Sequence, residues 1–285
     1  MFLVADSGST KTDWLVLNNK GEVISSYITL GYNPLIVDSD FIFDDLMNHA
    51  DIRLNASKIT HVYFYGAGCS SPHLNIIIAD ALKRIYVHAE IIVDHDLLAS
   101  ALASYDGYPV VCAILGTGSN ACFYDGENLT QTRPALGYLL GDEGSGSYFG
   151  KILLKSFLYK RLKSNLHSDF IDQYKLDKHK IFASIYKADR PNTYLASFMP
   201  FFAKHRKHPQ INNWLINGFD EFIKTHVVDY PINKVNFIGS IGYYFKEELE
   251  IVCQQNGLEL LGCDKEPIHR LAKSIYKYLY TKTNH

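Results

Sequence analysis

The sequence predicts an α/β protein built from two similar halves. Up to Ala103, strand patterns alternate with helical patterns, which indicates that part of a sheet is parallel. The chain nevertheless opens on three consecutive strands joined by short turns, which is typical of an antiparallel meander. A unit of strand, glycine-rich turn and strand occurs twice, at Phe2–Leu17 and at Val110–Tyr124. This repeat predicts a duplicated fold of mixed sheets flanked by helices.

The elements of the first half follow from runs of apolar and β-branched residues between turn residues. The predicted strands are Phe2–Asp6, Thr12–Leu17, Val23–Thr29, Ile59–Tyr65 and Glu90–Val93, and the predicted helices are Ser71–Tyr86 and Leu97–Ala103. The turn Asn18–Gly21 suits a hairpin. Pro34 disfavours helix at the residue before it, so we expect Asn33 on a loop.

The second half repeats the opening hairpin and then becomes largely helical from Phe157 to about His226. We assign no chemistry to that helical region, whose lysines and histidines indicate a solvated surface. A terminal helix begins at Pro267 and carries an apolar stripe at helical spacing. The other predicted elements are the strands Val110–Leu115, Asn120–Tyr124, Val235–Ile238 and Leu258–Leu261 and the helix Tyr243–Gln255.

The composition is that of a globular protein with a full core. The chain has 285 residues, of which 47% are hydrophobic and 20% charged, and a net charge of −2. That charge gives no electrostatic case for nucleic acid or an anionic membrane. The five cysteines include no Cys-x-x-Cys pair, which favours a reducing compartment and argues against disulfides, zinc or an iron–sulfur cluster. The first residues do not form a signal peptide and no apolar run reaches spanning length, so we expect a cytoplasmic protein.

Two features near the start of the chain suit phosphate chemistry. The turn between the first two strands, Asp6–Thr12, offers backbone N–H groups, hydroxyls and an ammonium beside a carboxylate, as a metal-bound polyphosphate requires. The alternative is an ordinary hairpin with a polar turn. Asp96 follows a strand and begins a helix, where ligands bind in open α/β sheets. It is either a helix N-cap or a catalytic base, and the two roles do not exclude each other.

Two glycine-rich segments of the second half are further candidates for ligand binding. The segment Gly137–Ser147 contains four glycines and the adjacent acids Asp142 and Glu143 ahead of a helix. The turn Gly239–Gly242 follows a strand, and its glycines either admit a flat ring or allow close packing of the next helix.

Four motifs in this order resemble those of a known family. They are Asp6–Thr12, Gly116–Asn120, Gly141–Ser145 and Gly239–Gly242. The sequence is similar to N-acetylglucosamine kinases of the BadF/BadG/BcrA/BcrD-type ATPase group, within the actin–hexokinase–Hsp70 superfamily. The resemblance implies a two-domain actin-like, ribonuclease H-like fold that binds ATP between its domains. The first domain would contain residues 1–106 and 267–285, and the second residues 107–266 with a helical insertion.

The resemblance also implies roles for individual residues. It makes Asp96 the catalytic base and Asp6 the ligand of Mg²⁺. The residues implied to bind phosphate are Gly8, Ser9, Thr10 and Lys11 on the first turn and Gly116, Thr117, Gly118 and Ser119 on the second. Those implied to border adenosine are Gly239, Ser240 and Gly242. Those implied to bind sugar are Asn33, Asn120 and Asp142. The chain departs from the family at Leu136, where a tryptophan is usual, and at Ile268–Arg270, where a glycine is usual.

The function that we expect is phosphoryl transfer from ATP to the 6-hydroxyl of N-acetylglucosamine or a close relative. Its partners would be small molecules, with neither nucleic acid nor membrane; the oligomeric state stays open, a homodimer included. One alternative is a BadF-type ATPase that activates a partner enzyme through an iron–sulfur cluster. Another is a non-catalytic sensor of sugar or nucleotide, because a fold alone does not determine function.

Overall fold

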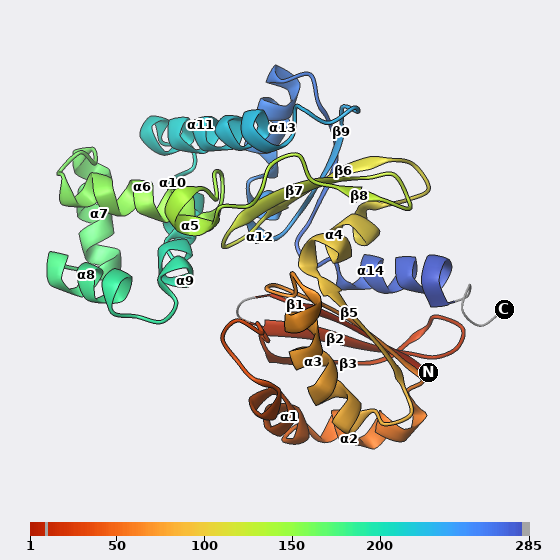
Figure 1. The fold of residues 1–285 in the computed structure, drawn as a ribbon. Helices are drawn as coiled ribbons and strands as arrows, with labels where there is room; N and C mark the ends of the chain where they lie inside the picture. The colour runs from red at the N-terminus through yellow and green to blue at the C-terminus, as the bar shows by residue number, and fades with distance from the viewer. Residues whose placement is uncertain (9–10, 281–285) are drawn as a thin grey trace. The chain divides into compact units, whose positions relative to one another are not determined.

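The chain divides into two units, each with its own five-stranded sheet (Figure 1). The structure, a computed structural model, describes residues 1–8 and 11–280. Unit 1 contains Met1–Tyr108 together with the C-terminal segment from Pro267, and unit 2 contains Pro109–Glu266.

Unit 1 is a mixed sheet in the order β3-β2-β1-β4-β5. The pairs β1–β2 and β2–β3 are antiparallel, whereas β4 pairs in parallel with both β1 and β5. Its elements are β1 (Phe2–Ser7), β2 (Lys11–Leu17), β3 (Val23–Leu30), α1 (Ser39–Met47), α2 (Ala50–Asn55), the 3₁₀ turn η1 (Ala56–Lys58), β4 (His61–Gly66), α3 (Pro72–Ile85), β5 (Glu90–His95), α4 (Asp96–Ser104), α14 (Ile268–Ile275) and the π-helical turn η2 (Tyr276–Tyr280).

Strand β1 is covered on both faces. Leu3 and Ala5 belong to an apolar cluster with residues of α1 and α3, such as Ile42 and Ile78. On the other face, the ring of Phe2 stacks on Tyr276 at 6.2 Å between centroids, and α14 packs against α4. Because both faces are buried, this strand is a continuous apolar run rather than an alternating one, as strands with parallel neighbours usually are.

Unit 2 has the strand order β10-β9-β6-β7-β8, which repeats that of unit 1. Three strands form an antiparallel meander and two more add in parallel, so the predicted duplication is confirmed. Its elements are β6 (Val110–Leu115), β7 (Ser119–Tyr124), β8 (Leu129–Thr130), α5 (Gly137–Leu140), α6 (Gly146–Leu158), α7 (Ser164–Tyr174), α8 (Lys178–Tyr186), α9 (Pro191–Ala196), α10 (Met199–His205), α11 (Pro209–His226), β9 (Lys234–Ile238), α12 (Ser240–Tyr244), α13 (Lys246–Gln255) and β10 (Glu259–Asp264).

The predicted helix over Tyr243–Gln255 differs from the structure. It starts earlier, at Ser240, and is divided into α12 and α13 at Phe245, a buried residue outside helical geometry (φ −113°, ψ 31°). The ring of Phe245 belongs to the apolar core of unit 2, so packing of a large side chain interrupts a continuous helical pattern.

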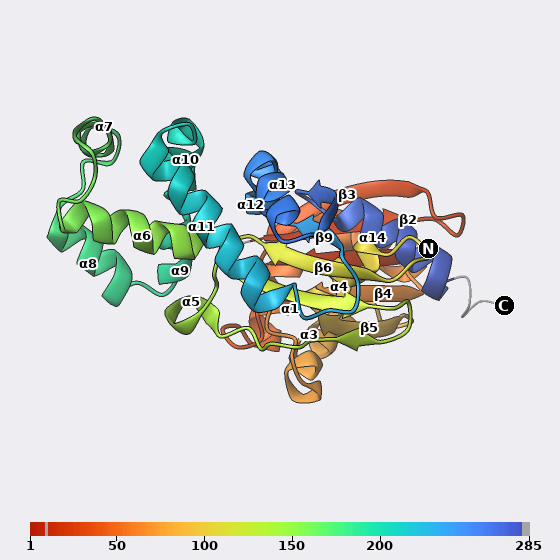
Figure 2. The same cartoon turned by 90° about the horizontal axis from the view of Figure 1, so that it is seen from above.

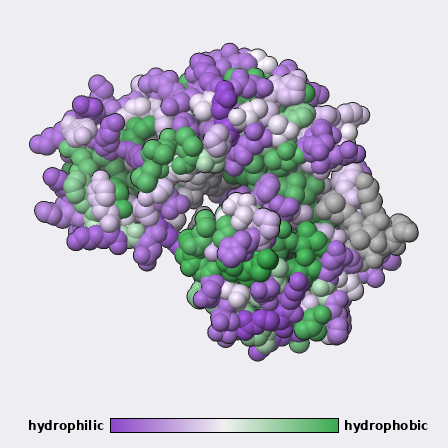
Figure 3. All heavy atoms as spheres, in the orientation of Figure 1, coloured by the Kyte–Doolittle hydropathy of each residue, from purple (hydrophilic) through white to green (hydrophobic). Residues whose placement is uncertain are grey.

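The helical region between β8 and β9 shares one apolar core with the sheet of unit 2. Helices α6–α10 gather beyond one end of the sheet, whereas α11 runs back along it (Figure 2). Figure 3 shows hydrophilic residues over the outer surface of these helices and apolar residues between them. Every helix in the described part of the chain is too short or too polar to cross a membrane.

Helices α6 and α9 approach each other closely at Gly150. A Cβ on this glycine would lie 2.0 Å from the backbone oxygen of Leu195, a separation that only backbone movement could relieve. The glycine is therefore required by packing, and its helix position disfavours any larger residue.

We expect Gly150→Ala to lower the free energy of unfolding by about 1–3 kcal/mol, the usual range for overpacking a core. Urea unfolding followed by far-ultraviolet circular dichroism measures the change. Lys155→Ala on the exposed side of α6 is the matched control and should stay within about 0.5 kcal/mol of wild type. Equal stability of the two variants would contradict the close approach.

Candidate active site

The turn between β1 and β2 begins as the sequence predicts, at the carboxyl end of a buried strand. Gly8 N donates to Lys11 O at 3.0 Å, and Lys11 Nζ donates to Asp13 Oδ1 at 3.0 Å. The Lys11 ammonium is thus held beside the hairpin by a carboxylate of the next strand. The predicted phosphate ligands Ser9 and Thr10 lie outside the described residues.

A chain of buried hydroxyls connects this hairpin to the loop that carries Asn33. Tyr32 N donates to Ser7 Oγ at 3.0 Å, Ser7 Oγ lies 2.7 Å from Thr12 Oγ1, and Thr12 Oγ1 donates to Leu30 O at 2.8 Å. Ser7 and Thr12 are fully buried. This bracing role was not predicted, although hydroxyl residues at the turn ends of two apolar strands indicate it.

The bracing places Asn33 against the loop after β4. Asn33 Oδ1 accepts a hydrogen bond from Leu35 N at 2.9 Å, which leaves its amide N–H₂ group as the donor for a ligand. Gly68 lies directly under this side chain, since a Cβ there would be 2.2 Å from Asn33 Oδ1. The φ of Gly68 is +85°, so this glycine meets both a conformational and a packing demand.

Asp96 is the first residue of α4 and follows directly on β5. The N-cap of α4 is not Asp96 but His95, whose Nδ1 accepts a hydrogen bond from Leu98 N at 3.0 Å. The capping alternative for Asp96 is therefore wrong, and its carboxylate is left for another role. Burial raises the pKa of Asp96, while His95 and the backbone N–H groups of Leu97 and Asp96 itself oppose that rise.

Asp6 lies at the carboxyl end of β1 within the electrostatic reach of Asp96. Burial, Asp96 and Asp13 raise the pKa of Asp6 to about 7, with Lys11 acting in the opposite direction. The charged form of such a carboxylate is stabilised by a bound divalent cation, which takes the place of the proton. The described residues contain no cluster of three or more metal-ligating side chains. The donor set fits Mg²⁺, which commonly binds one or two carboxylates together with water and phosphate oxygens.

In unit 2, the turn between β6 and β7 is held by the loop that precedes α6. Ser119 N donates to Asp142 Oδ1 at 3.3 Å, and a Cβ on Gly118 would lie 2.9 Å from Asp142 Oδ2. Gly146 N and Ser147 N donate to Gly116 O and Thr117 O at 2.8 and 3.0 Å. The structure therefore brings two of the predicted segments together. Ser119 Oγ is buried and has no hydrogen-bond partner within the described ranges, so this hydroxyl is available to form a hydrogen bond with a ligand.

Asp142 itself has a left-handed backbone, with φ of 60°. Burial raises the pKa of its carboxyl group, and the hydrogen bond from Ser119 N opposes that rise. The next residue, Glu143, contacts His226 of α11, with Glu143 Oε2 and His226 Nε2 3.2 Å apart and both side chains largely buried. Glu143 thus anchors the loop, whereas Asp142 faces the glycine turn.

Asn120 is not joined to Asp142 by a hydrogen bond in the described structure. Its Oδ1 accepts from its own neighbour Ala121 N at 2.9 Å and from Gln131 Nε2 on the exposed side of the sheet. The alternation of β7 explains this direction, because Ser119 and Asn120 point to opposite faces. Of the three predicted sugar ligands, Asn33 and Asp142 lie on loops and Asn120 lies in strand β7.

The turn Gly239–Gly242 packs directly against the end of β6. Gly239 has φ of +110°, and a Cβ there would lie 2.5 Å from Leu115 O, so both conformation and space require glycine. Space is restricted at Gly242 as well, where a Cβ would lie 3.1 Å from Phe237 Cβ. Close packing thus explains both glycines, and it brings Ser240 beside the β6–β7 turn.

A pocket of about 530 Å³ in unit 2 joins the two glycine turns. Gly116 and Thr117 line it from one side, and Ser240, Tyr244 and Phe245 from another. Its remaining wall comes from the insertion and consists of Thr193, Ala196, Ser197, Met199, Pro200 and Ala203, with Ile241 of α12 opposite. The sequence analysis assigned no chemistry to the insertion and so missed this wall. Contacts between segments so distant in the chain leave no local signal.

The pocket has the character of a site for a flat apolar group with polar ends. Most of its lining is aliphatic or aromatic, and Thr193 Oγ1 in its wall is buried without a hydrogen-bond partner in the part of the chain that is described. Small-molecule sites typically combine such an apolar lining with a few unsatisfied polar groups.

A comparison with solved structures finds similar proteins along the whole chain. A putative N-acetylglucosamine kinase from Porphyromonas gingivalis is 35% identical, with 97% of this chain and 99% of that chain covered and a TM-score of 0.92. A second putative N-acetylglucosamine kinase, from Chromobacterium violaceum, is 15% identical over 96% and 99% of the two chains, with a TM-score of 0.76. A ROK family glucokinase from Streptomyces griseus in complex with glucose and AMPPNP is 12% identical over 95% and 98%, with a TM-score of 0.55.

The sequence matches no protein-family model and no curated protein. The family is shown by the first of the solved structures, because 35% identity over 97% of this chain extends through both units. The predicted α/β, two-domain actin-like fold is confirmed by the same similarity. This protein belongs to the family of N-acetylglucosamine kinase-like proteins among the actin-like sugar kinases.

Proposed function

We propose that this protein transfers the γ-phosphoryl group of ATP to the 6-hydroxyl of N-acetylglucosamine or a closely related amino sugar. One observation carries the proposal: a partly buried carboxylate, Asp96, begins α4 in a chain 35% identical to a putative N-acetylglucosamine kinase. Phosphoryl transfer relies on positioning and on neutralising charge, and the two glycine turns and Lys11 are suited to both.

Asp96 acts as the general base. A sugar hydroxyl has a pKa far above 7 and becomes a better nucleophile when a carboxylate accepts its proton as the bond to phosphorus forms. The raised pKa of Asp96 favours this step, because the carboxylate binds a proton more readily than an exposed one does. His95 caps α4 and so fixes the first turn on which Asp96 is carried.

The phosphates of ATP bind at the β1–β2 and β6–β7 turns. The first turn contributes Gly8, Ser9, Thr10 and Lys11, and the second contributes backbone N–H groups and the unpaired Ser119 hydroxyl. Asp6 holds Mg²⁺, which when bound neutralises phosphate charge. Ser240, with Gly239 and Gly242 behind it, borders the adenosine in the 530 Å³ pocket.

Asn120, the third sugar ligand that the family resemblance implies, is hydrogen-bonded to Gln131 and is left out of this proposal. Asn33 and Asp142 bind hydroxyls of the sugar. Their partly buried polar groups discriminate between sugars, because a hydroxyl that is missing leaves such a group without a partner. A second class of function, activation of a partner enzyme through an iron–sulfur cluster, is disfavoured because four of the five free cysteines are buried.

A coupled assay of ADP release tests the function, with N-acetylglucosamine, glucosamine, N-acetylmuramic acid and glucose as acceptors. We expect sugar-dependent release that is largest for an N-acetylated amino sugar. Release that is independent of sugar would favour an ATPase, and no release with retained nucleotide binding would favour a sensor. Iron analysis of the purified protein tests the third function, because only an activator with an iron–sulfur cluster would contain iron.

In this assay, Asp96→Asn should lower kcat at least ~100-fold, the usual effect of losing a general base, with the KM values for both substrates nearly unchanged. Asp94→Asn, two residues earlier on β5, is the matched control and should stay within about tenfold of wild type. Similar turnover of the Asp96 variant and wild type would exclude Asp96 as the base.

Asp6 gives a prediction for pH. Its folded pKa of about 7 exceeds the ordinary 3.8, so the folded state holds a proton that the unfolded state has released. Stability is therefore lost as the pH rises from about 4 through 7. Asp6→Asn removes this loss. We therefore expect the unfolding free energy of the metal-free variant, minus that of wild type, to be larger at pH 8 than at pH 4 by about 2–4 kcal/mol.

Urea unfolding at the two pH values, in chelator, measures this difference. Asp80→Asn changes an exposed carboxylate of α3 and should show no such pH dependence. A constant difference between wild type and the Asp6 variant would contradict the raised pKa.

Ala203 is an exposed residue in the wall of the nucleotide pocket. Ala203→Trp should fill the space for adenosine and raise the KM for ATP at least ~10-fold, about 1.4 kcal/mol of binding, without changing the KM for sugar. Lys207→Trp, exposed just beyond α10 and outside the pocket lining, controls for the added indole. An unchanged KM for ATP would show that nucleotide binds elsewhere.

A further inference from the structure

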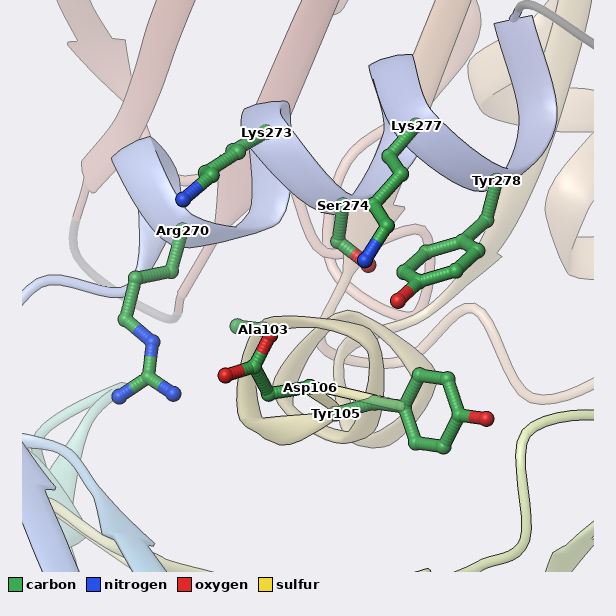
Figure 4. Close-up of a pocket in the computed structure, with 8 residues that line it drawn as sticks. All are labelled: Ala103, Tyr105, Asp106, Arg270, Lys273, Ser274, Lys277 and Tyr278. Carbon is green, nitrogen blue, oxygen red and sulfur yellow. The ribbon is translucent and has the colours of Figure 1, made fainter. Parts of the chain in front are cut away.

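Unit 1 contains a second pocket, outside every segment assigned to the proposed reaction. It lies between α14 with η2 and the C-terminal end of α4, and its volume is about 170 Å³ (Figure 4). At about 30 Å³ per molecule, this is the space of some five or six waters, which suits a five-atom phosphate group. Its lining consists of Ala103, Tyr105, Asp106, Arg270, Lys273, Ser274, Lys277 and Tyr278.

Three cations line this pocket from one side of a helix. Arg270, Lys273 and Lys277 are three and four residues apart, the spacing that brings side chains to the same side. Asp106 is the only carboxylate among the lining residues, which carry three positively charged side chains. Lys273 has no ion-pair partner within residues 1–8 and 11–280. The pKa of Lys277 is raised, chiefly by its hydrogen bond with Tyr278 and further by Asp106, so its ammonium stays charged.

A buried hydroxyl without a partner lies in the middle of the three cations. Ser274 is 6% exposed, and its Oγ has no hydrogen-bond partner in the described chain. In Figure 4 this hydroxyl points from α14 toward the end of α4, where Asp106 faces it. An unpaired buried hydroxyl is destabilising, and each such group in a native protein requires an explanation, such as a bound water or ion.

Two tyrosines form the aromatic side of the pocket. The rings of Tyr105 and Tyr278 meet edge to face at 5.4 Å between centroids, and Lys277 Nζ lies 4.6 Å from the centre of the Tyr278 ring. The lining residues Lys277 and Tyr278 belong to η2, a π-helical turn. Such turns are rare, and they occur frequently at functional sites.

A simpler explanation is that the cations only balance Asp106 and the negative end of α4. That explanation leaves the buried hydroxyl of Ser274 without a partner in the described chain. We propose that this pocket binds a small phosphate-bearing anion, which Arg270, Lys273 and Lys277 contact through charge-assisted hydrogen bonds and to which Ser274 donates. Asp106 faces the same cations and competes with the anion for them.

Binding of inorganic phosphate to the full chain, measured by isothermal titration calorimetry at constant ionic strength, tests this site. A saturating non-hydrolysable ATP analogue keeps phosphate out of the proposed nucleotide site. We expect the double variant Arg270→Gln/Lys273→Gln to weaken phosphate binding about tenfold or more, as the loss of two charge contacts of up to ~1 kcal/mol each implies. Asp106→Asn should instead tighten binding about 2–5-fold, a gain that misfolding cannot produce.

The double variant Lys58→Gln/Lys83→Gln removes two exposed charges elsewhere in unit 1 and should bind phosphate as wild type does. Glucose 6-phosphate in place of phosphate distinguishes the source of the anion. Tighter binding of the sugar phosphate assigns the site to a phosphorylated metabolite, and equal or weaker binding assigns it to free phosphate. Equal phosphate affinity in wild type, the pocket double variant and Asp106→Asn, or no binding at all, would overturn the proposal. Either result is independent of the kinase assay, because no residue of this pocket has a role in the proposed reaction.

Discussion

The partial burial of two carboxylates, Asp6 and Asp96, is the constraint on which unit 1 depends. Each lies at the carboxyl end of a strand in a sheet whose central strand is closed to water on both faces. Burial of charge is unfavourable unless something compensates for it, and these two groups also oppose each other. The fold offers partial compensation through Lys11 and the N-terminus of α4, and the remainder is available to a cation and a substrate proton.

The two units hold their glycine turns in place by different interactions. Both present a glycine turn at the end of the first strand, yet the first turn is braced by hydroxyls and the second by a carboxylate. Ser7 and Thr12 connect the β1–β2 hairpin to the strand before Asn33, whereas Asp142 reaches from a separate loop to Ser119 N. A duplicated framework can therefore hold its two glycine turns by different interactions.

The helical insertion of unit 2 forms one wall of a pocket. Its helices α9 and α10 close the pocket beside Gly116 and Ser240, and the tight contact at Gly150 fixes α9 against α6. Leu136, where the family usually has tryptophan, is 56% exposed and precedes α5. In the proposed reaction, a smaller side chain at this point would leave room for a different acyl or amino group on the sugar.

The sequence by itself determined the strands, the glycine turns, the repeat and the candidate carboxylates, because these follow from local periodicity and from residues with special backbone freedom. Only the tertiary structure decided that His95 rather than Asp96 caps α4, since capping depends on which side chain turns back toward the helix. It also decided that the glycines at 239 and 242 serve close packing, that Asn120 is hydrogen-bonded to Gln131, and that Thr193 and Ala203 line a pocket with Gly116. The pocket around Ser274 belongs to the same group, because it joins residues near 105 to residues near 275. Contacts over such separations come from the packing of whole elements, and no local pattern in a single sequence encodes them.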